Sequence, residues 1–156
     1  MNYWLMKSEP SAFSIDDLAK KPNKTNHWDG VRNYQVRNML RDQMQPGDLA
    51  FFYHSSCEIP GIAGIIKITS AGYPDFTALD PEEHHYDPKS SRENPRWYMV
   101  DVCLQEKFKR LISLTELRGQ PELHAMPLLQ RGSRLSITPV TSAEWKTIVT
   151  LAKKTA

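Results

Sequence analysis

Hydrophobic positions along this chain fall into short runs, and turn residues separate one run from the next. The runs are too short for free-standing helices, and their β-branched and aromatic content is typical of buried strands. We expect strands over residues 3–6, 49–54, 61–69, 97–104 and 135–140. In the third strand, Ile62, Ile66 and Ile68 are expected on one side, and Gly64 is expected to let another backbone or a ligand approach closely.

Three helix starts are marked by a hydroxyl side chain that is followed three positions later by a carboxylate. In this pattern the hydroxyl accepts a hydrogen bond from a backbone N–H of the first turn, which would otherwise have no partner. The pairs are Ser14 with Asp17, Ser113 with Glu116 and Thr141 with Glu144. In addition, the apolar residues of 33–44 recur at spacings of three and four, which predicts an amphipathic helix. The last pair begins a helix that we expect over 142–154.

The order of these elements favours an α+β domain. Strands outnumber helices and do not alternate regularly with them, so we expect a barrel-like arrangement instead of a doubly wound parallel sheet. The 156 residues are enough for one ordinary domain and too few for two with proper cores. We therefore assign residues 1–156 to a single domain.

Composition and charge narrow the class of protein. Lys and Arg number 20 and Asp and Glu 18, which gives a formal charge of +2, and 40% of the residues are hydrophobic, as in soluble globular proteins. Because the chain has no large excess of positive charge, any nucleic-acid binding must come from a local patch. The N-terminus has no signal-peptide core and no run reaches roughly 18 apolar residues, so we expect no membrane segment. The two cysteines fit a reducing compartment inside the cell.

The stretch 73–95 is the least regular part of the chain. Four prolines interrupt it and most of its charged residues are acidic, and a loop of this length is commonly functional. His84 and His85 lie among its carboxylates, but adjacent side chains in an extended segment point in opposite directions and cannot easily share one ion. We therefore expect a solvated loop and no metal.

Catalytic motifs are weak in this sequence. With seven glycines, the chain has neither a Walker-type phosphate loop nor a dinucleotide fingerprint. His54, Ser55 and Cys57 are near enough in sequence to suggest nucleophilic catalysis, but no elbow motif places a base beside a nucleophile. Packing of Cys57 in the interior is the simpler interpretation.

The segment 28–34 is the strongest candidate for ligand binding. If it faces a cleft, Trp28 can stack on a planar ligand, Asn33 can pair with the ligand's edge, and amides at the following helix start favour a phosphate. Alternatively, Trp28 belongs to the core and Arg32 forms a surface ion pair. A second segment with polar groups, residues 52–55, ends a predicted strand and favours the ligand-binding interpretation.

Six motifs follow one another along the chain. They are Tyr3–Pro10, Trp28–Gln35, Gly47-Asp48 followed by Phe52–Ser55, Tyr86–Ser90, Pro95–Trp97 and Ser133–Ser136. Together they resemble the EVE domain, the family of the thymocyte nuclear protein and its bacterial relatives. This resemblance implies a PUA-like mixed β-barrel flanked by helices, as in the related ASCH and YTH domains. It also implies a non-enzymatic module that reads a modified base of DNA or RNA in an aromatic pocket.

Carried over residue by residue, the resemblance implies two groups of functional side chains. The walls and polar readers of the base pocket are Ser8, Trp28, Asn33, Tyr34, Tyr53, His54 and Ser55. Contacts to phosphates or base edges are expected from Lys7, Arg32, Lys89, Arg96, Arg134 and Ser136. The remaining tryptophans, Trp4, Trp97 and Trp145, lie in apolar patterns and are expected in the core. We expect modified DNA or RNA as the ligand, bound without a cofactor or a metal.

Two other functions stay open on the sequence alone. One is a small enzyme that acts on a nucleotide or a similar planar metabolite, for which His54 and Cys57 are the candidate residues. The other is an accessory protein that binds a partner through the acidic loop. We further expect a monomer, located in the cytoplasm if the chain is bacterial and in the nucleus if it is eukaryotic.

Overall fold

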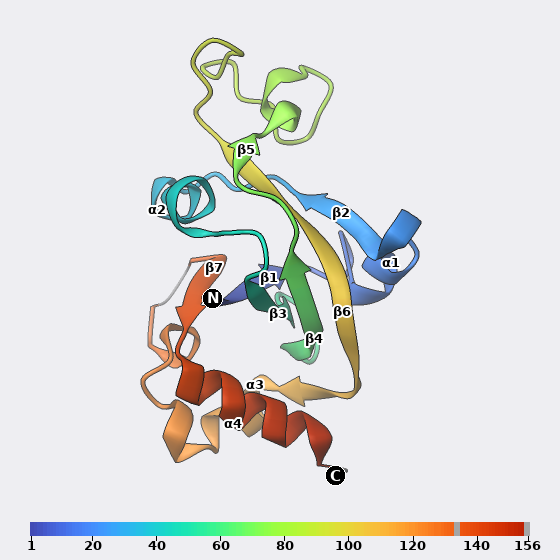
Figure 1. Cartoon of the computed structure of the whole chain (residues 1–156), viewed down its shortest axis with the longest axis vertical. Helices are drawn as coiled ribbons and strands as arrows, with labels where there is room; N and C mark the ends of the chain where they lie inside the picture. Colours follow the sequence, from blue (N-terminus) through green and yellow to red (C-terminus); the bar gives the residue numbers. More distant parts are fainter. Residues whose placement is uncertain (133–134, 155–156) are drawn as a thin grey trace.

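A mixed seven-stranded sheet organises the chain, and short helices pack around it (Figure 1). This computed structural model describes residues 1–132 and 135–154. The strands are β1 (Tyr3–Ser8), β2 (Thr25–Trp28), β3 (Leu49–His54), β4 (Gly61–Ile68), β5 (Tyr73–Pro74), β6 (Tyr98–Ser113) and β7 (Ile137–Val140). The helices are α1 (Ile15–Ala19), α2 (Tyr34–Asn38) with a π-helical extension (Met39–Gln43), α3 (Leu114–Arg118) and α4 (Ser142–Lys153). Short 3₁₀ turns cover Pro22–Lys24, Phe76–Leu79, Pro121–Leu123 and Pro127–Leu129.

The central strands β1 and β3 run parallel, so the polar residues at their carboxyl ends lie side by side. The strand order is β2-β6-β4-β3-β1-β7, and β5 pairs with the start of β6. The register of the parallel pair sets Lys7 beside Tyr53 and Ser8 beside His54. Polar residues that follow the two apolar runs are therefore neighbours in space, although more than forty positions separate them in the sequence.

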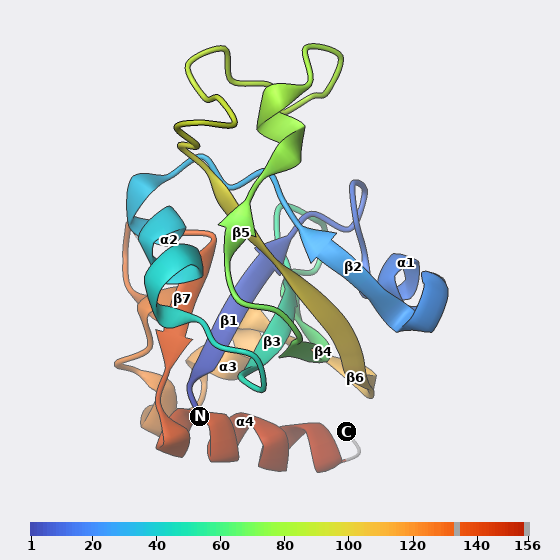
Figure 2. The ribbon, with the colours of Figure 1, turned by 45° about the horizontal axis from the view of Figure 1, so that its top comes forward.

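Side chains of the central strands enter two hydrophobic clusters, one on each face of the sheet. In β1, Trp4 and Met6 pack with Leu18 of α1, whereas Leu5 packs with Trp145 of α4. This alternation follows from the period of two in a strand. It also explains why the strands read as continuous apolar runs, since both faces are covered. Figure 2 shows α4 at the end of the molecule opposite the loop between β5 and β6.

One expectation about β4 is wrong. Ile62 packs in the cluster on the α4 face, whereas Ile66 and Ile68 pack in the cluster on the α1 face. Two steps along β4, from Ile62 to Gly64, oppose a single step of β3, from Tyr53 to Phe52, and the extra residue of β4 reverses the alternation of its side chains. The close approach predicted at Gly64 is confirmed, because a Cβ there would lie 2.3 Å from the carbonyl oxygen of Glu106.

The predicted helix starts are confirmed. The side chains of Ser14, Ser113 and Thr141 each accept a hydrogen bond from the backbone N–H three residues later, at 3.1 Å in all three cases. The strands β2 and β5 and the second half of β6 were not predicted. Three of the four residues of β2 are polar, and β5 has only two residues. In β6, residues 105–107 and Lys109 are polar and exposed around the buried Phe108.

The α+β class is confirmed, whereas closure of the sheet into a barrel stays a prediction. The end strands of the path, β2 and β7, are not joined by a hydrogen-bonded ladder within the described ranges. In the same part of the chain, no helix combines the length and the apolar character needed to cross a membrane.

Candidate nucleic-acid interface

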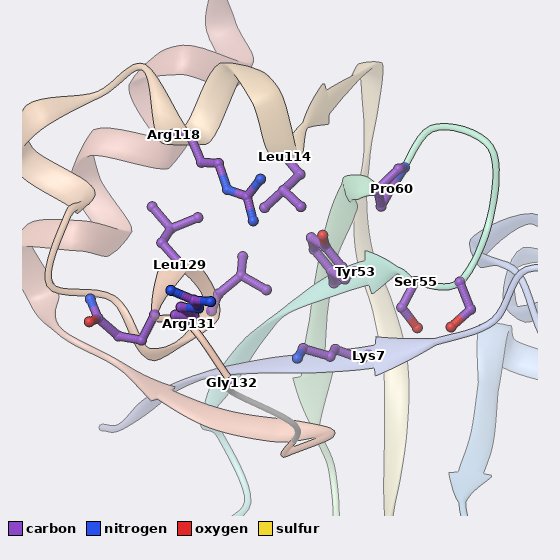
Figure 3. A pocket seen from close by; sticks show the side chains of 12 residues that line it. Lys7, Tyr53, Ser55, Pro60, Leu114, Arg118, Leu129, Arg131 and Gly132 are labelled. Atoms are coloured by element: carbon purple, nitrogen blue, oxygen red, sulfur yellow. The ribbon is translucent and has the colours of Figure 1, made fainter.

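Two cavities adjoin the end of β1, and Lys7 lines both of them. The first, the Trp28 cavity, has a volume of about 610 Å³ and is lined by Lys7, Ser8, Glu9, Ala12, Phe13, Asn26, His27, Trp28, Asp29, Gly30, His84 and His85. The second, the Arg118 cavity, has a volume of about 570 Å³ and is lined by Lys7, Tyr53, Ser55, Ser56, Pro60, Leu114, Arg118, Leu128, Leu129, Gln130, Arg131 and Gly132 (Figure 3). Both volumes are typical of sites for small ligands.

Trp28 forms a wall of its cavity while most of its ring belongs to the core. Only 8% of the residue is exposed, and its ring meets that of Phe52 edge to face with centroids 5.4 Å apart. Another part of the wall comes from the end of β1 and the turn after it. There the Ser8 hydroxyl donates a hydrogen bond to the carbonyl oxygen of Phe13 at 2.6 Å, which holds the turn in place. Of the predicted base-pocket residues, Ser8 and Trp28 are thus brought together.

The buried carboxylate of Asp75 ties the turn after Trp28 to the loop between β5 and β6. Its Oδ2 accepts hydrogen bonds from the Gly30 backbone N–H at 2.9 Å and from Arg32 at 3.2 Å, while Thr77 donates to Oδ1. Burial opposes ionisation of Asp75, but the hydrogen bonds outweigh it and hold its pKa below the ordinary value. Arg32 also donates to the carbonyl oxygen of His85. Its guanidinium is therefore engaged within the protein.

Gly30 allows His85 of the loop between β5 and β6 to approach the turn after Trp28 closely. Its φ is +80°, and a Cβ at this position would lie 2.7 Å from Cε1 of His85. Only glycine combines this backbone conformation with so close a neighbour. His84 and His85 thereby line the Trp28 cavity. Within the described ranges, no group of three His, Cys, Asp or Glu side chains is arranged to hold a metal ion.

A second set of contacts holds the far end of the loop. The Trp97 indole N–H donates to Asp87 at 2.5 Å, and this hydrogen bond lowers the pKa of Asp87. Arg96 lies 3.7 Å from the same carboxylate. Lys89 contributes its backbone N–H to Asp87, and the residue is exposed. Trp97 is buried, as predicted, and so are Trp4 and Trp145.

Asn33 and Tyr34 do not line the Trp28 cavity. The Asn33 side chain caps α2 by accepting a hydrogen bond from Val36 N–H at 3.0 Å. Tyr34 is 46% exposed and stacks on Trp97 with centroids 4.9 Å apart. The guanidinium of Arg37 lies 4.8 Å from the centre of the Tyr34 ring. Tyr34 and Arg37 thus belong to an aromatic and cationic surface on α2 that is separate from the Trp28 cavity.

His54 faces α1 and not a nucleophile. Its Nε2 accepts a hydrogen bond from the Ile15 backbone N–H at 3.2 Å, and its ring packs edge to face on Phe52. Burial lowers the pKa of His54, which keeps the ring neutral and able to accept. Among the described residues, no hydrogen bond joins His54 to Ser55 or Cys57.

Tyr53 and Ser55 line the Arg118 cavity, on the other side of β3 from His54. Side chains alternate along a strand, so consecutive residues of β3 cannot share one pocket. Ser136 lies beside the end of β1, where its carbonyl oxygen accepts a hydrogen bond from Lys7 N–H at 2.8 Å. The predicted phosphate contact Arg134 lies outside the described residues.

Sequence reasoning missed several residues of the Trp28 cavity, including Glu9, Asn26 and His27. Asn26 and His27 belong to β2, whose polar sequence gave no strand signal. The alternating spacing of Asn26 and Trp28 is the one pattern that could have indicated a shared face. The sequence predicts a solvated loop for His84 and His85, and their place in the cavity wall depends on long-range contacts of Arg32.

The fold and the site define a small α+β domain with two cavities that adjoin the end of β1. The sequence profile of the EVE domain matches residues 2–151. The chain therefore belongs to the EVE domain family.

Relatives in animals and bacteria support this assignment. The chain is 45% identical over 170 residues to thymocyte nuclear protein 1 of Homo sapiens, a match that covers 98% of this chain and 75% of the human protein. A crystal structure of a Pseudomonas putida protein is 53% identical and has a TM-score of 0.92, with 96% of this chain and 99% of that chain covered. The human THYN1 protein in complex with DNA that contains 5-methylcytosine is 45% identical and has a TM-score of 0.92, with 100% of both chains covered.

Proposed function

We propose that this protein reads a modified base of a nucleic acid, and that the Trp28 cavity receives the base. The observation that carries the proposal is the cavity of about 610 Å³ at the end of β1, with an indole on one wall and polar side chains around it. A base held outside a helical stack needs a flat apolar wall and partners for its hydrogen-bonding edge. The cavity offers both.

The lining residues favour a base with an exocyclic amine. Glu9 is a carboxylate acceptor, which suits the N4 amine of a cytosine, and the Asn26 amide can both donate and accept. Ala12 and Phe13 supply apolar surface for an added methyl group. We therefore assign 5-methylcytosine as the first base to test, and the human relative in complex with 5-methylcytosine DNA supports this choice.

The side chains predicted to contact phosphates fall into two groups, those held within the protein and those on its surface. Arg32 is engaged by Asp75 and acts as a positioning residue for the loop. Arg96 contacts Tyr34 and Asp87 outside the cavity, and Lys89 is exposed on the loop; we propose that both can meet phosphates of a bound strand.

A non-enzymatic role fits the site better than catalysis. The candidate base His54 has its Nε2 occupied by a backbone N–H, and no described nucleophile is within hydrogen-bond reach of it. Nucleophilic catalysis requires that contact. The acidic loop likewise has a role within the protein, since it carries His84 and His85 to the cavity.

The test compares oligonucleotides that differ in a single methyl group. Fluorescence anisotropy at low salt, with single- and double-stranded DNA, is expected to show tighter binding of the 5-methylcytosine strand than of the cytosine strand. Ala12→Phe fills the cavity without removing a core residue and should abolish the preference, whereas Ala125→Phe, at an exposed turn, should leave it unchanged. Equal affinities of the unaltered protein for both strands would refute the proposal.

A further inference from the structure

The Arg118 cavity differs in charge from the Trp28 cavity. Glu9 and Asp29 line the Trp28 cavity, so an anion placed there would meet negative charge. The Arg118 cavity is lined by the cations Lys7, Arg118 and Arg131, and by no Asp or Glu among its described lining residues. The two cavities are thus suited to different parts of a ligand.

Three separate elements bring the cations together. Lys7 lies near the end of β1, Arg118 is the last residue of α3, and Arg131 follows the 3₁₀ turn Pro127–Leu129. Figure 3 shows the three side chains extending into one space beside Tyr53. None of them forms an ion pair with another described residue. Their charges are therefore available to an anion from outside.

Neutral donors and an apolar floor complete the cavity. Burial raises the pKa of the Tyr53 hydroxyl, so this group stays protonated and can donate a hydrogen bond. Ser55 adds a second hydroxyl, and Leu114 and Leu129 supply apolar surface. Burial also lowers the pKa of Lys7, and a bound anion would favour its charged form. At about 570 Å³, the cavity has room for a phosphate together with an attached sugar.

We propose that the Arg118 cavity binds the phosphate group of a nucleotide. That phosphate can belong to a nucleic-acid strand or to a free mononucleotide, because both present the same anion. The strand form rests on the proposed function. Since Lys7 borders both cavities, a strand whose base enters the Trp28 cavity brings a neighbouring phosphate toward Arg118.

The first experiment titrates the protein with inorganic phosphate and follows its backbone amides by NMR. We expect saturable shifts of Ser55 and Ser56 in the unaltered protein and in Lys153→Gln, which removes an exposed cation from the last turn of α4. Arg118→Gln removes the cation at the last residue of α3, and most of the phosphate-induced shift should disappear in this variant. Arg118→Lys keeps a positive charge and should retain part of the shift. Absence of saturable shifts, or identical shifts in Arg118→Gln, would overturn the proposal.

The second experiment identifies the source of the phosphate. For a strand phosphate, Arg118→Gln should reduce the slope of log affinity against log salt for a methylated oligonucleotide by about 0.7–1. For a free nucleotide, the variant should weaken binding of cytidine monophosphate and leave the oligonucleotide slope unchanged. Either result supports a phosphate site, and a variant that changes neither contradicts it.

The same oligonucleotides separate this inference from the proposed function. If the unaltered protein prefers the methylated strand but Arg118→Gln changes no phosphate measurement, only the phosphate site is refuted. If the phosphate measurements respond but no methyl preference exists, the base-reading function is refuted and the phosphate site stands.

Discussion

Arg32 donates a hydrogen bond to the buried Oδ2 of Asp75 at 3.2 Å, and this pair joins the turn after Trp28 to the loop whose His84 and His85 line the cavity. An arginine beside a predicted nucleic-acid site is readily interpreted as a phosphate contact. Here its nearest partners are a carboxylate and two backbone carbonyls of the same chain. Its effect on a ligand is therefore expected to pass through the position of the loop.

Arg32→Gln should distinguish these two roles. Loss of the guanidinium leaves the buried Asp75 with one charged partner fewer, which we expect to cost about 1–3 kcal/mol of unfolding free energy. Binding of the methylated strand should weaken while the salt slope stays unchanged, because no phosphate contact is lost. Urea denaturation and affinities at several salt concentrations measure both effects. A slope reduced by about 1, with stability unchanged, would instead assign Arg32 to a phosphate.

Asp75 should also contribute a pH-dependent part of the stability. Its folded pKa lies below the ordinary value of 3.8, so the folded state favours the ionised form. The contribution is fully present above the unfolded pKa and is lost as the pH falls through the folded pKa. The difference in unfolding free energy between the unaltered protein and Asp75→Asn should therefore shrink from pH 7 to pH 3. Glu93→Gln, at an exposed position, should show no such change, and a constant difference for Asp75→Asn would contradict the prediction.

His54 is expected to destabilise the fold when it is protonated. Burial lowers its folded pKa below the ordinary 6.5, so its stabilising contribution is present above pH 6.5 and decreases as the pH falls through the folded pKa. His54→Gln keeps a side-chain acceptor for the Ile15 N–H and should lose less stability between pH 7.5 and 5 than the unaltered protein. The exposed His124→Gln serves as the control. Parallel pH curves for all three proteins would refute a role for His54.

Much of the fold follows from local patterns in the sequence. The caps at Ser14 and Thr141 need only residues three positions apart, and β1 and β3 carry continuous apolar runs because both of their faces are buried. The missed strand β2 depends instead on pairing with β6, and its polar residues line a cavity. Local patterns cannot show such long-range pairing.

The candidate site was predictable only in part for the same reason. Ser8 and Trp28 line one cavity, because each ends a strand whose place is set by the sheet. The resemblance assigns Tyr53 and His54 to one pocket, yet the strand turns their side chains to opposite faces. The place of His85 is set by Gly30 and Arg32, more than fifty positions away.

Gly30→Ala should disturb the cavity through two separate effects. Alanine at φ +80° is strained, and its Cβ would lie 2.7 Å from the His85 ring, which must then move. Gly47→Ala isolates the first effect, because Gly47 has φ +97° and a Cβ added there would meet no atom within 4 Å. Backbone strain alone is expected to cost about 1–2 kcal/mol in each variant. Only Gly30→Ala should also weaken binding of the methylated strand, and equal affinities of the two variants would exclude His85 as a wall of the cavity.

Trp28 should carry both stability and recognition, and two substitutions separate these contributions. Trp28→Ala removes a side chain that is only 8% exposed and should cost about 3–5 kcal/mol of unfolding free energy. Trp28→Phe keeps an aromatic ring against Phe52 and should retain a larger part of the stability. It offers less stacking surface, so affinity for the methylated strand should still fall, since stacking on an aromatic side chain contributes about 1–3 kcal/mol per base.

The matched control for Trp28→Phe is Trp145→Phe. Trp145 is buried to a similar extent, but it stacks on Phe51 at 3.9 Å in the cluster on the α4 face, away from the Trp28 cavity. Both variants should lose stability, because each reduces a buried indole to a smaller ring. Only Trp28→Phe should also lose affinity for the methylated strand. If the two variants bind that strand equally well at a temperature where both are folded, the Trp28 ring serves the core alone and the base must be held elsewhere.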